Sequence, residues 1–196
     1  APIFRDGELI LFVSNIAHHS DIGGMAPGSM AGGMTEIYQE GLRIPPIRIV
    51  QEDKILQDVF DLVLLNVRVP SERRGDYMAQ IAANRLGNRR LKELFKKWSK
   101  EQIELGCSAI IDAVTRRMRS SIAELPDGEY AFEDVLDDDG MGTENIPVVV
   151  KIEKQGEEIW LDFQGSGPQV RGNMNNSFAG LQASVLFALK VLVDPD

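Results

Sequence analysis

Two adjacent histidines and a nearby aspartate are the residues of this sequence whose types are best suited to chemistry. His18 and His19 are the only histidines among the 196 residues, and Asp21 follows two positions after His19. Neutral imidazole and carboxylate groups bind zinc, manganese or iron(II), so all three residues are candidate metal ligands. The same residues also fit a hydrogen-bonded structural pair, and their spacing leaves both interpretations open.

The elements that must position these residues are a strand and a glycine-rich loop. Residues 8–14 form an apolar run that predicts a strand, and the Asp-Gly pair before it predicts a hairpin turn. Repeated glycines and prolines after Asp21 disfavour regular structure until about Thr35. Neighbouring residues of a strand point to opposite faces, so only one histidine would face a site. From spacing and strand direction we expect this histidine to be His18.

A short polar segment after the loop could supply further groups. Residues 35–41 predict one helical turn that ends at Gly41. Glu36 and Glu40 would share a face of that turn, and Arg43 follows it. These residues fit a polar wall that faces the histidine loop, and they fit surface ion pairing equally well.

The middle of the chain has helical periodicity. We expect a strand over residues 47–50, a helix over 57–67 and a long helix from 71 to 102 with a kink at Gly87. A further helix is expected over residues 106–124. Together these helices predict an antiparallel hairpin whose apolar stripes serve packing. Cys107 lies in its last helix and is expected to be an inert, buried thiol.

The period of the pattern changes to two after Gly128, which predicts strands and a solvated acidic turn at residues 137–140. Ser177 is the expected cap of a final apolar helix. The fold class is therefore α+β: N-terminal strands and a glycine-rich loop, a central antiparallel helical hairpin, and C-terminal β-hairpins followed by an apolar helix. We expect a single partial domain, with a strand and loop region, a helical region and a β-hairpin region over residues 1–56, 57–125 and 126–196.

Composition excludes several classes of protein. The net charge of -9 argues against a nucleic-acid binder, and the basic cluster between Arg85 and Lys100 is interpreted as a solvated helix face. No apolar run approaches the ~20 residues that cross a bilayer. The single cysteine excludes a disulfide framework and indicates a reducing, cytoplasmic location. The chain does not begin with Met, so we expect a piece of a longer polypeptide.

Three other kinds of site find little support in the motifs. Ser20 and Ser29 lie near the histidines, but no Gly-x-Ser-x-Gly elbow is present for a serine nucleophile. The glycine-rich segments match neither a P-loop nor a dinucleotide fingerprint, which disfavours nucleotide binding by this segment. The acidic turn would place Val135 and Ile146 at the anchoring positions of a calcium loop, so it fails that pattern.

Several motifs resemble the hydantoinase B/5-oxoprolinase family, which also includes the large subunits of acetone and acetophenone carboxylases. The specific block is residues 15–24, and supporting motifs extend over essentially the whole chain. These motifs are residues 27–30, 35–46, 66–68, 75–76 with 79–84, 117–119, 125–128, 132–134 with 137–140, 162–163 and 168–172.

The resemblance implies a function that composition does not show. Family members work with a hydantoinase A-type subunit or fused domain, which uses ATP to phosphorylate the substrate, so a hetero-oligomer is expected. The B part completes the reaction at a divalent metal, which would be zinc, manganese or iron. His18 or His19 would be a ligand, Asp21 a ligand or an orienting group, and Glu36, Glu40 and Arg43 would line the site. Expected substrates are cyclic amides such as hydantoins, 5-oxoproline or lactams.

Two other functions stay open. In the ketone carboxylase branch of the family the reaction would be a ligation, and the loop would alternatively belong to a non-catalytic scaffold. Family motifs expected to supply further metal ligands, Asn-Asp-Pro-Tyr and Thr-His-Leu-Pro-Asp, precede the first strand and are not in this sequence. The chain alone is therefore expected to be inactive.

Overall fold

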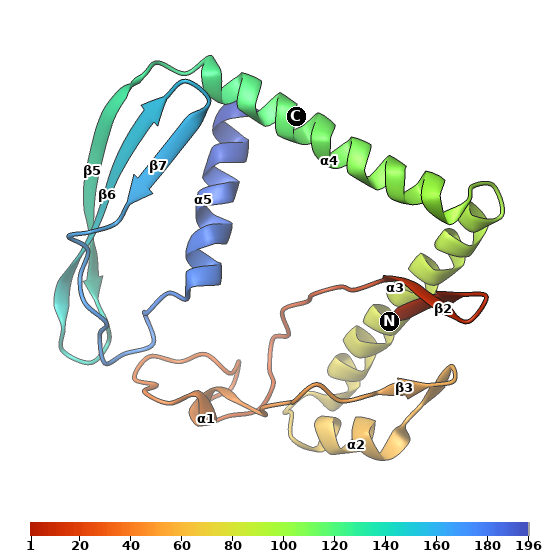
Figure 1. The fold of residues 1–196 in the computed structure, drawn as a ribbon. Helices are drawn as coiled ribbons and strands as arrows, with labels where there is room; N and C mark the ends of the chain where they lie inside the picture. Colours follow the sequence, from red (N-terminus) through yellow and green to blue (C-terminus); the bar gives the residue numbers. More distant parts are fainter. Residues whose placement is uncertain (196) are drawn as a thin grey trace. The chain divides into compact units, whose positions relative to one another are not determined.

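The computed structural model describes residues 1–195, which form two compact units. The first unit is Ala1–Ile103 and the second is Glu104–Asp196. Each unit is described by itself, and Figure 1 shows the elements in chain order by colour. Helices and small antiparallel sheets occur together in the chain, so the α+β class predicted from the sequence is confirmed.

Two short hairpins lie in the first unit. β1 (Pro2–Arg5) and β2 (Glu8–Phe12) pair across the expected Asp-Gly turn. β3 (Val50–Gln51) pairs with β4 (Lys54–Ile55), so the strand predicted over residues 47–50 is wrong except at its last residue. The β3–β4 turn places Glu52 and Asp53 at φ of 49° and 61°, a left-handed conformation that non-glycine residues rarely adopt. No glycine therefore signals this turn in the sequence.

Three helices complete the first unit. α1 (Ile37–Glu40) is the expected helical turn, with Gly41 as its C-cap, and α2 (Gln57–Leu65) and α3 (Pro70–Phe95) follow. The hydrophobic core of this unit lies where α2 meets α3. Phe60, Leu64 and Val67 are buried there, with Ile55 and Tyr77 packed against them.

The boundaries of the long helices differ from the prediction. α3 runs through Gly87 without a break and ends at Phe95 instead of residue 102. A Cβ at Gly87 would lie 2.6 Å from Cγ1 of Val13, so this glycine allows close packing and does not mark an interruption. α4 (Lys100–Ala123) starts earlier than expected, since Ser99 and Gln102 exchange hydrogen bonds in a capping box.

A three-stranded antiparallel sheet dominates the second unit, in the order β5 (Gly128–Asp138), β6 (Glu144–Gln155) and β7 (Glu158–Asp162). α5 (Phe178–Val193) follows the sheet. Ser177 Oγ accepts a hydrogen bond from the Gly180 backbone N–H at 3.1 Å, which confirms the predicted cap. The acidic turn departs from expectation because Asp139 is fully buried rather than solvated.

Neither α4 nor α5 buries a side chain against the described residues. Cys107, on α4, is consequently exposed, and the prediction of a buried thiol is wrong. α3 lies in the first unit and α4 mostly in the second, so the antiparallel packing of these helices stays a prediction. Over residues 1–195 no helix is long and apolar enough to span a membrane.

Candidate functional site

The segment that leaves β2 is anchored along α3. Asn15 Nδ2 donates hydrogen bonds to the Gln80 carbonyl and to Asn84 Oδ1, both at 3.0 Å. Gln80 Nε2 donates back to Asn15 Oδ1 at 2.9 Å. With the contact between Val13 and Gly87, these bonds hold the approach to the histidines against successive turns of one helix.

The two histidines have different surroundings. The His19 side chain is 12% exposed, its ring centroid lies 4.7 Å from that of Tyr77, and Nδ1 lies 3.6 Å from Asp76 Oδ2. His18 is exposed, and over residues 1–195 it has no hydrogen bond or ion pair. His19 therefore fixes the loop to α3, whereas the imidazole of His18 is available to a ligand.

A buried arginine supports the contact of His19 with α3. Arg73 Nη1 lies 2.8 Å from Asp76 Oδ2, and the Arg73 side chain is only 6% exposed. Burial raises the pKa of the Tyr77 hydroxyl, which keeps that side chain neutral. Nδ1 of His19 is itself buried without a hydrogen-bond partner, at 3.6 Å from the carboxylate.

Asp21 is buried, and its carboxylate is fully occupied by donors. Oδ1 accepts from the backbone N–H groups of Gly23 (2.9 Å) and Arg68 (3.3 Å). Oδ2 accepts from the Gly28 backbone N–H and from Arg68 Nη1, both at 3.0 Å. The Gly23 N–H contributes most to holding the pKa of Asp21 far below its usual value, although burial acts in the opposite direction. These four bonds use the four lone-pair positions of the carboxylate.

The guanidinium of Arg68 also ties the loop backbone directly. It donates to the carbonyls of Gly23, Ala26 and Gly24 at 3.1, 2.9 and 2.7 Å. Gly24 has φ of 85°, and a Cβ there would lie 2.4 Å from the carbonyl oxygens of Gln39 and Glu40, so no side chain fits. The loop is therefore held in one conformation by a side chain from the α2–α3 connection.

The segment after the loop lies against it. The Met25 N–H donates to the Gln39 carbonyl at 2.7 Å, and the Leu42 N–H donates to the Ile22 carbonyl at 2.9 Å. The structure thus brings the polar segment predicted from the sequence next to the histidine loop.

The three polar candidates in that segment are all exposed. Arg43 stacks over the Tyr38 ring, at 4.9 Å from its centroid. It lines a hollow of about 360 Å³ with Gly24, Tyr38, Gly41, Leu42 and Asn66. Glu36 precedes α1, and Glu40 is the last residue of that helix. Neither glutamate lines the hollow, so the structure assigns only Arg43 to a concave surface.

The whole chain, residues 1–196, matches the family model for hydantoinase B/oxoprolinase. The chain belongs to the hydantoinase B/oxoprolinase family. It is 33% identical to the caprolactamase subunit beta of Pseudomonas jessenii over 186 residues, which cover 95% of this chain and 32% of that protein. It is 31% identical to the 5-oxoprolinase of Saccharomyces cerevisiae over 206 residues, covering 97% of this chain and 16% of the relative.

One solved structure agrees with the family membership, and a second shows the same fold. The crystal structure of the ATP-dependent caprolactamase from Pseudomonas jessenii superposes with a TM-score of 0.85, at 31% identity, over 97% of this chain and 33% of that one. A nucleotide-free acetone carboxylase superposes with a TM-score of 0.80 over 100% of this chain and 27% of the other, at 19% identity, which shows a shared fold. The chain spans about a third or less of the length of these relatives.

A complete metal site of the kind that the family resemblance implies is not formed by the described residues alone. Over residues 1–195, no group of three or more His, Cys, Asp or Glu side chains is arranged to hold a metal ion. Asp21 has no unused lone pair in this loop, and His19 is packed against α3. His18 is the one of the three predicted ligands that is free to bind.

The sequence interpretation missed the residues that hold the loop. Asn15 and Arg68 lay within motifs used for the resemblance, but neither received a role, and Asp76 and Tyr77 were treated as parts of a helix. The available signal for Arg68 was its place in a short connection between two helices, α2 and α3. Its partners lie more than 40 residues away in sequence, so spacing could not reveal them.

Proposed function

We propose that this chain is part of the B-type subunit of an ATP-dependent cyclic amidohydrolase of the N-methylhydantoinase or 5-oxoprolinase type. The proposal is supported by the family membership and by relatives whose names are caprolactamase and 5-oxoprolinase. In it, a hydantoinase A-type partner activates the substrate with ATP, and the B subunit opens the activated ring. Because the chain covers about a third of the caprolactamase subunit, the activity is proposed for the full-length protein.

The contrast between the two histidines carries the site proposal. His18 is exposed, without partners in the described part of the chain, on a loop that is fixed by His19, Asp21 and Arg68. We assign to His18 the role of metal ligand, with the other ligands supplied by segments outside residues 1–196. His19 and Asp21 orient the loop. A metal bound there would polarise the substrate carbonyl or activate a water molecule.

The remaining roles in the proposal belong to the exposed polar segment. Arg43 is held by Tyr38 and has no acidic partner among the described residues, so its guanidinium is free to bind an oxygen that becomes negative during ring opening. Glu36 and Glu40 are exposed near the same loop and are assigned to proton transfer.

Metal analysis of the full-length subunit tests this assignment. His18→Ala is expected to lower metal content and to reduce ATP-dependent ring opening at least ~100-fold, because a direct ligand is lost. Ser20→Ala is the matched control, since Ser20 is exposed in the same loop. Unchanged metal content and activity in His18→Ala would refute the role of His18.

A substrate assay separates the two enzymatic branches. The complete complex is supplied with ATP and either a hydantoin, 5-oxoproline or caprolactam, or with bicarbonate and a ketone. Ring opening of a cyclic amide is the expected result. Carboxylation of the ketone without ring opening would assign the protein to the branch of the acetone carboxylase, whose fold it shares. A metal-free complex that performs neither reaction would support a scaffold.

A further inference from the structure

A carboxylate of α3 lies beside the buried ring nitrogen of His19. Asp76 Oδ2 is 3.6 Å from His19 Nδ1, and the same oxygen is 2.8 Å from Nη1 of Arg73. Nδ1 is buried, and no hydrogen bond reaches it within residues 1–195. At 3.6 Å its contact with Asp76 is electrostatic and longer than a hydrogen bond. Among the described residues no other carboxylate pairs with His19.

Aromatic packing also holds the ring of His19. Its centroid lies 4.7 Å from that of Tyr77, and the two planes are inclined at 44°. Tyr77 in turn packs against Phe60, with 5.9 Å between the centroids, and Phe60 belongs to the hydrophobic core. Because packed side chains occupy defined rotamers, these contacts restrict the movement of His19 away from Asp76. The remaining freedom of a neutral imidazole is the choice of the nitrogen that carries the proton.

The carboxylate distinguishes between the two neutral forms of His19. With the proton on Nε2, the lone pair of Nδ1 would lie beside the negative oxygen of Asp76, and the two would repel each other. With the proton on Nδ1, the positive N–H group lies beside the same oxygen. Nδ1 is buried, so water screens this difference only weakly. The surroundings therefore favour the Nδ1–H form, which leaves the lone pair on Nε2.

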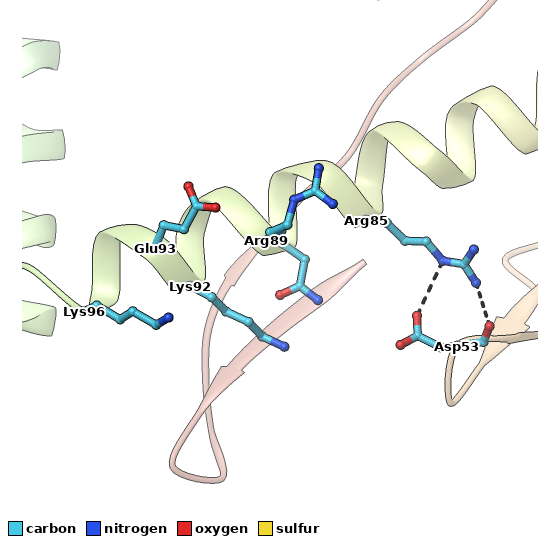
Figure 2. A pocket seen from close by; sticks show the side chains of 7 residues that line it. Asp53, Arg85, Arg89, Lys92, Glu93 and Lys96 are labelled. Atoms are coloured by element: carbon cyan, nitrogen blue, oxygen red, sulfur yellow. Dashed lines mark hydrogen bonds and ion pairs between the residues drawn. The ribbon is translucent and has the colours of Figure 1, made fainter.

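A second arginine–aspartate pair of α3 shows what is specific to the pair beside His19. Figure 2 shows Arg85 with Asp53: Nη2 donates to the Asp53 carbonyl at 2.6 Å, and Nε lies 3.5 Å from Oδ1. Their side chains are 46% and 90% exposed, so water screens the charges. The Arg73 side chain is only 6% exposed, and a buried cation needs a carboxylate as its partner. Arg73 therefore fixes the place of the Asp76 carboxylate beside His19.

We propose that Asp76 is a positioning residue that acts through His19. It holds the His19 proton on Nδ1 and the ring against α3, and it thereby fixes the backbone from which His18 extends. The consequence for His18 rests on the proposed function, in which that residue binds the metal, whereas the tautomer of His19 is independent of it. Without Asp76 the loop presents His18 in a less defined position, and the affinity for the metal falls.

NMR of the metal-free, full-length subunit with isotope-labelled histidine rings measures the tautomer. Long-range proton–nitrogen correlations, recorded well above the ordinary histidine pKa of about 6.5, distinguish the two neutral forms, and His19→Gln identifies the signal. His19 is expected in the Nδ1–H form in the wild type. Asp76→Ala is expected to shift it to the Nε2–H form, because no acceptor remains beside Nδ1 and the cation of Arg73 favours a lone pair there.

Two further variants make the result specific to the carboxylate. Asp76→Asn should keep the Nδ1–H form, because an amide oxygen can take the place of Oδ2 and accept from Arg73. Asp61→Ala is the matched control, since Asp61 is exposed and pairs with Arg74 of α3 at 3.4 Å. If Asp76→Ala fails to fold because Arg73 lacks a partner, Arg73→Met/Asp76→Ala removes the buried charge and should give the same shift. An Nε2–H form in the wild type, or an Nδ1–H form that persists without Asp76, overturns the proposal.

Metal titration separates the role of Asp76 from the proposed function. Zinc alone is titrated into the metal-free, full-length subunits, and Asp76→Ala is expected to weaken binding about tenfold while Asp61→Ala leaves it unchanged. A shifted tautomer with zinc binding unchanged in both Asp76→Ala and His18→Ala supports the action of Asp76 on His19 and refutes the metal role of His18. Zinc binding that falls in His18→Ala and stays unchanged in Asp76→Ala overturns the positioning role and leaves the proposed function intact.

Discussion

Each compact unit contains a buried aspartate that holds a loop, but the two aspartates are compensated differently. Asp21 accepts three backbone N–H bonds and pairs with the guanidinium of Arg68. Asp139 accepts from the N–H groups of Met141, Thr143 and Gly172 at 2.8, 2.9 and 3.2 Å, and no cation pairs with it among the described residues. Backbone N–H groups, with a hydrogen bond from the Thr143 side chain, therefore compensate this buried carboxylate without a cation among the described residues.

Arg68 is the main difference between the two sites, and its contacts indicate how firmly the loop at Asp21 is held. Asp139 joins the turn at residues 140–143 to Gly172 through hydrogen bonds from backbone N–H groups. Arg68 instead binds Asp21 and three carbonyls at once, so it sets the path of the loop from Asp21 to Ala26. Such redundancy is expected where a side chain must be held at a defined position for chemistry, as proposed for His18.

Replacing Arg68 tests this comparison with the largest expected effect. Arg68→Met removes the bonds to Asp21 and to three carbonyls, so the loop loosens and His18 loses its position. We expect ring opening by the full-length complex to fall ~100-fold, because misplacement by about 1 Å has effects of that size. The matched control is Arg74→Met, which removes an exposed arginine that pairs with Asp61 at 3.4 Å. Equal activity in both variants would contradict the role of Arg68.

Isosteric substitution compares the two aspartates directly. In Asp21→Asn, the new N–H₂ group replaces an oxygen that accepts two hydrogen bonds, whichever oxygen it replaces. The loss of these two bonds is expected to lower the free energy of unfolding by about 3 kcal/mol. In Asp139→Asn, Oδ1 keeps Met141 and Thr143, and only the bond from Gly172 is lost. Hydrogen exchange of the full-length protein should therefore accelerate more over residues 21–30 than over residues 139–143. The reverse order would show that the arginine adds nothing.

Low pH is expected to destabilise the Asp139 turn and the Asp21 loop at different pH values. This is the smallest of the expected effects, since neither site changes at neutral pH. The Thr143 N–H foremost, with those of Met141 and Gly172, lowers the pKa of Asp139 to about 2, and the pKa of Asp21 lies further below its usual value. A carboxylate with a lowered pKa stabilises the fold above its unfolded pKa of about 3.9, and this stabilisation is lost as the pH falls through the folded value.

The turn at Asp139 should therefore loosen first, between about pH 4 and pH 2. The loop at Asp21 should loosen at a lower pH. Hydrogen exchange in acid, followed over residues 139–143 and 21–30 in one sample, measures the order. Loosening of the Asp21 loop before the Asp139 turn would mean that Arg68 does not compensate its charge.

Local chemistry explains which elements the sequence predicted. The β1–β2 hairpin followed from Asp6-Gly7, because glycine favours the left-handed turn, and the α5 cap followed from Ser177. The β3–β4 hairpin was missed because Glu52 and Asp53 adopt that conformation without glycine. At the site, His18 is exposed and His19 is largely buried, and the roles assigned to them stay predictions. The hydrogen bond between Arg68 and Asp21 spans 47 residues, so no local pattern encodes it.

The segment of residues 13–19 also fixes the position of the histidines along α3. Val13 contacts Gly87, and Asn15 binds Gln80 and Asn84. His19 packs on Tyr77, so the extended segment runs antiparallel to α3 and contacts it at successive turns. The position of His18 therefore depends on the number of residues in this segment as well as on the loop that Asp21 and Arg68 hold. Deleting one residue between Asn15 and His18 would shift the imidazole by about 3.3 Å and turn it to the opposite side. Loop length there is as constrained as loop composition.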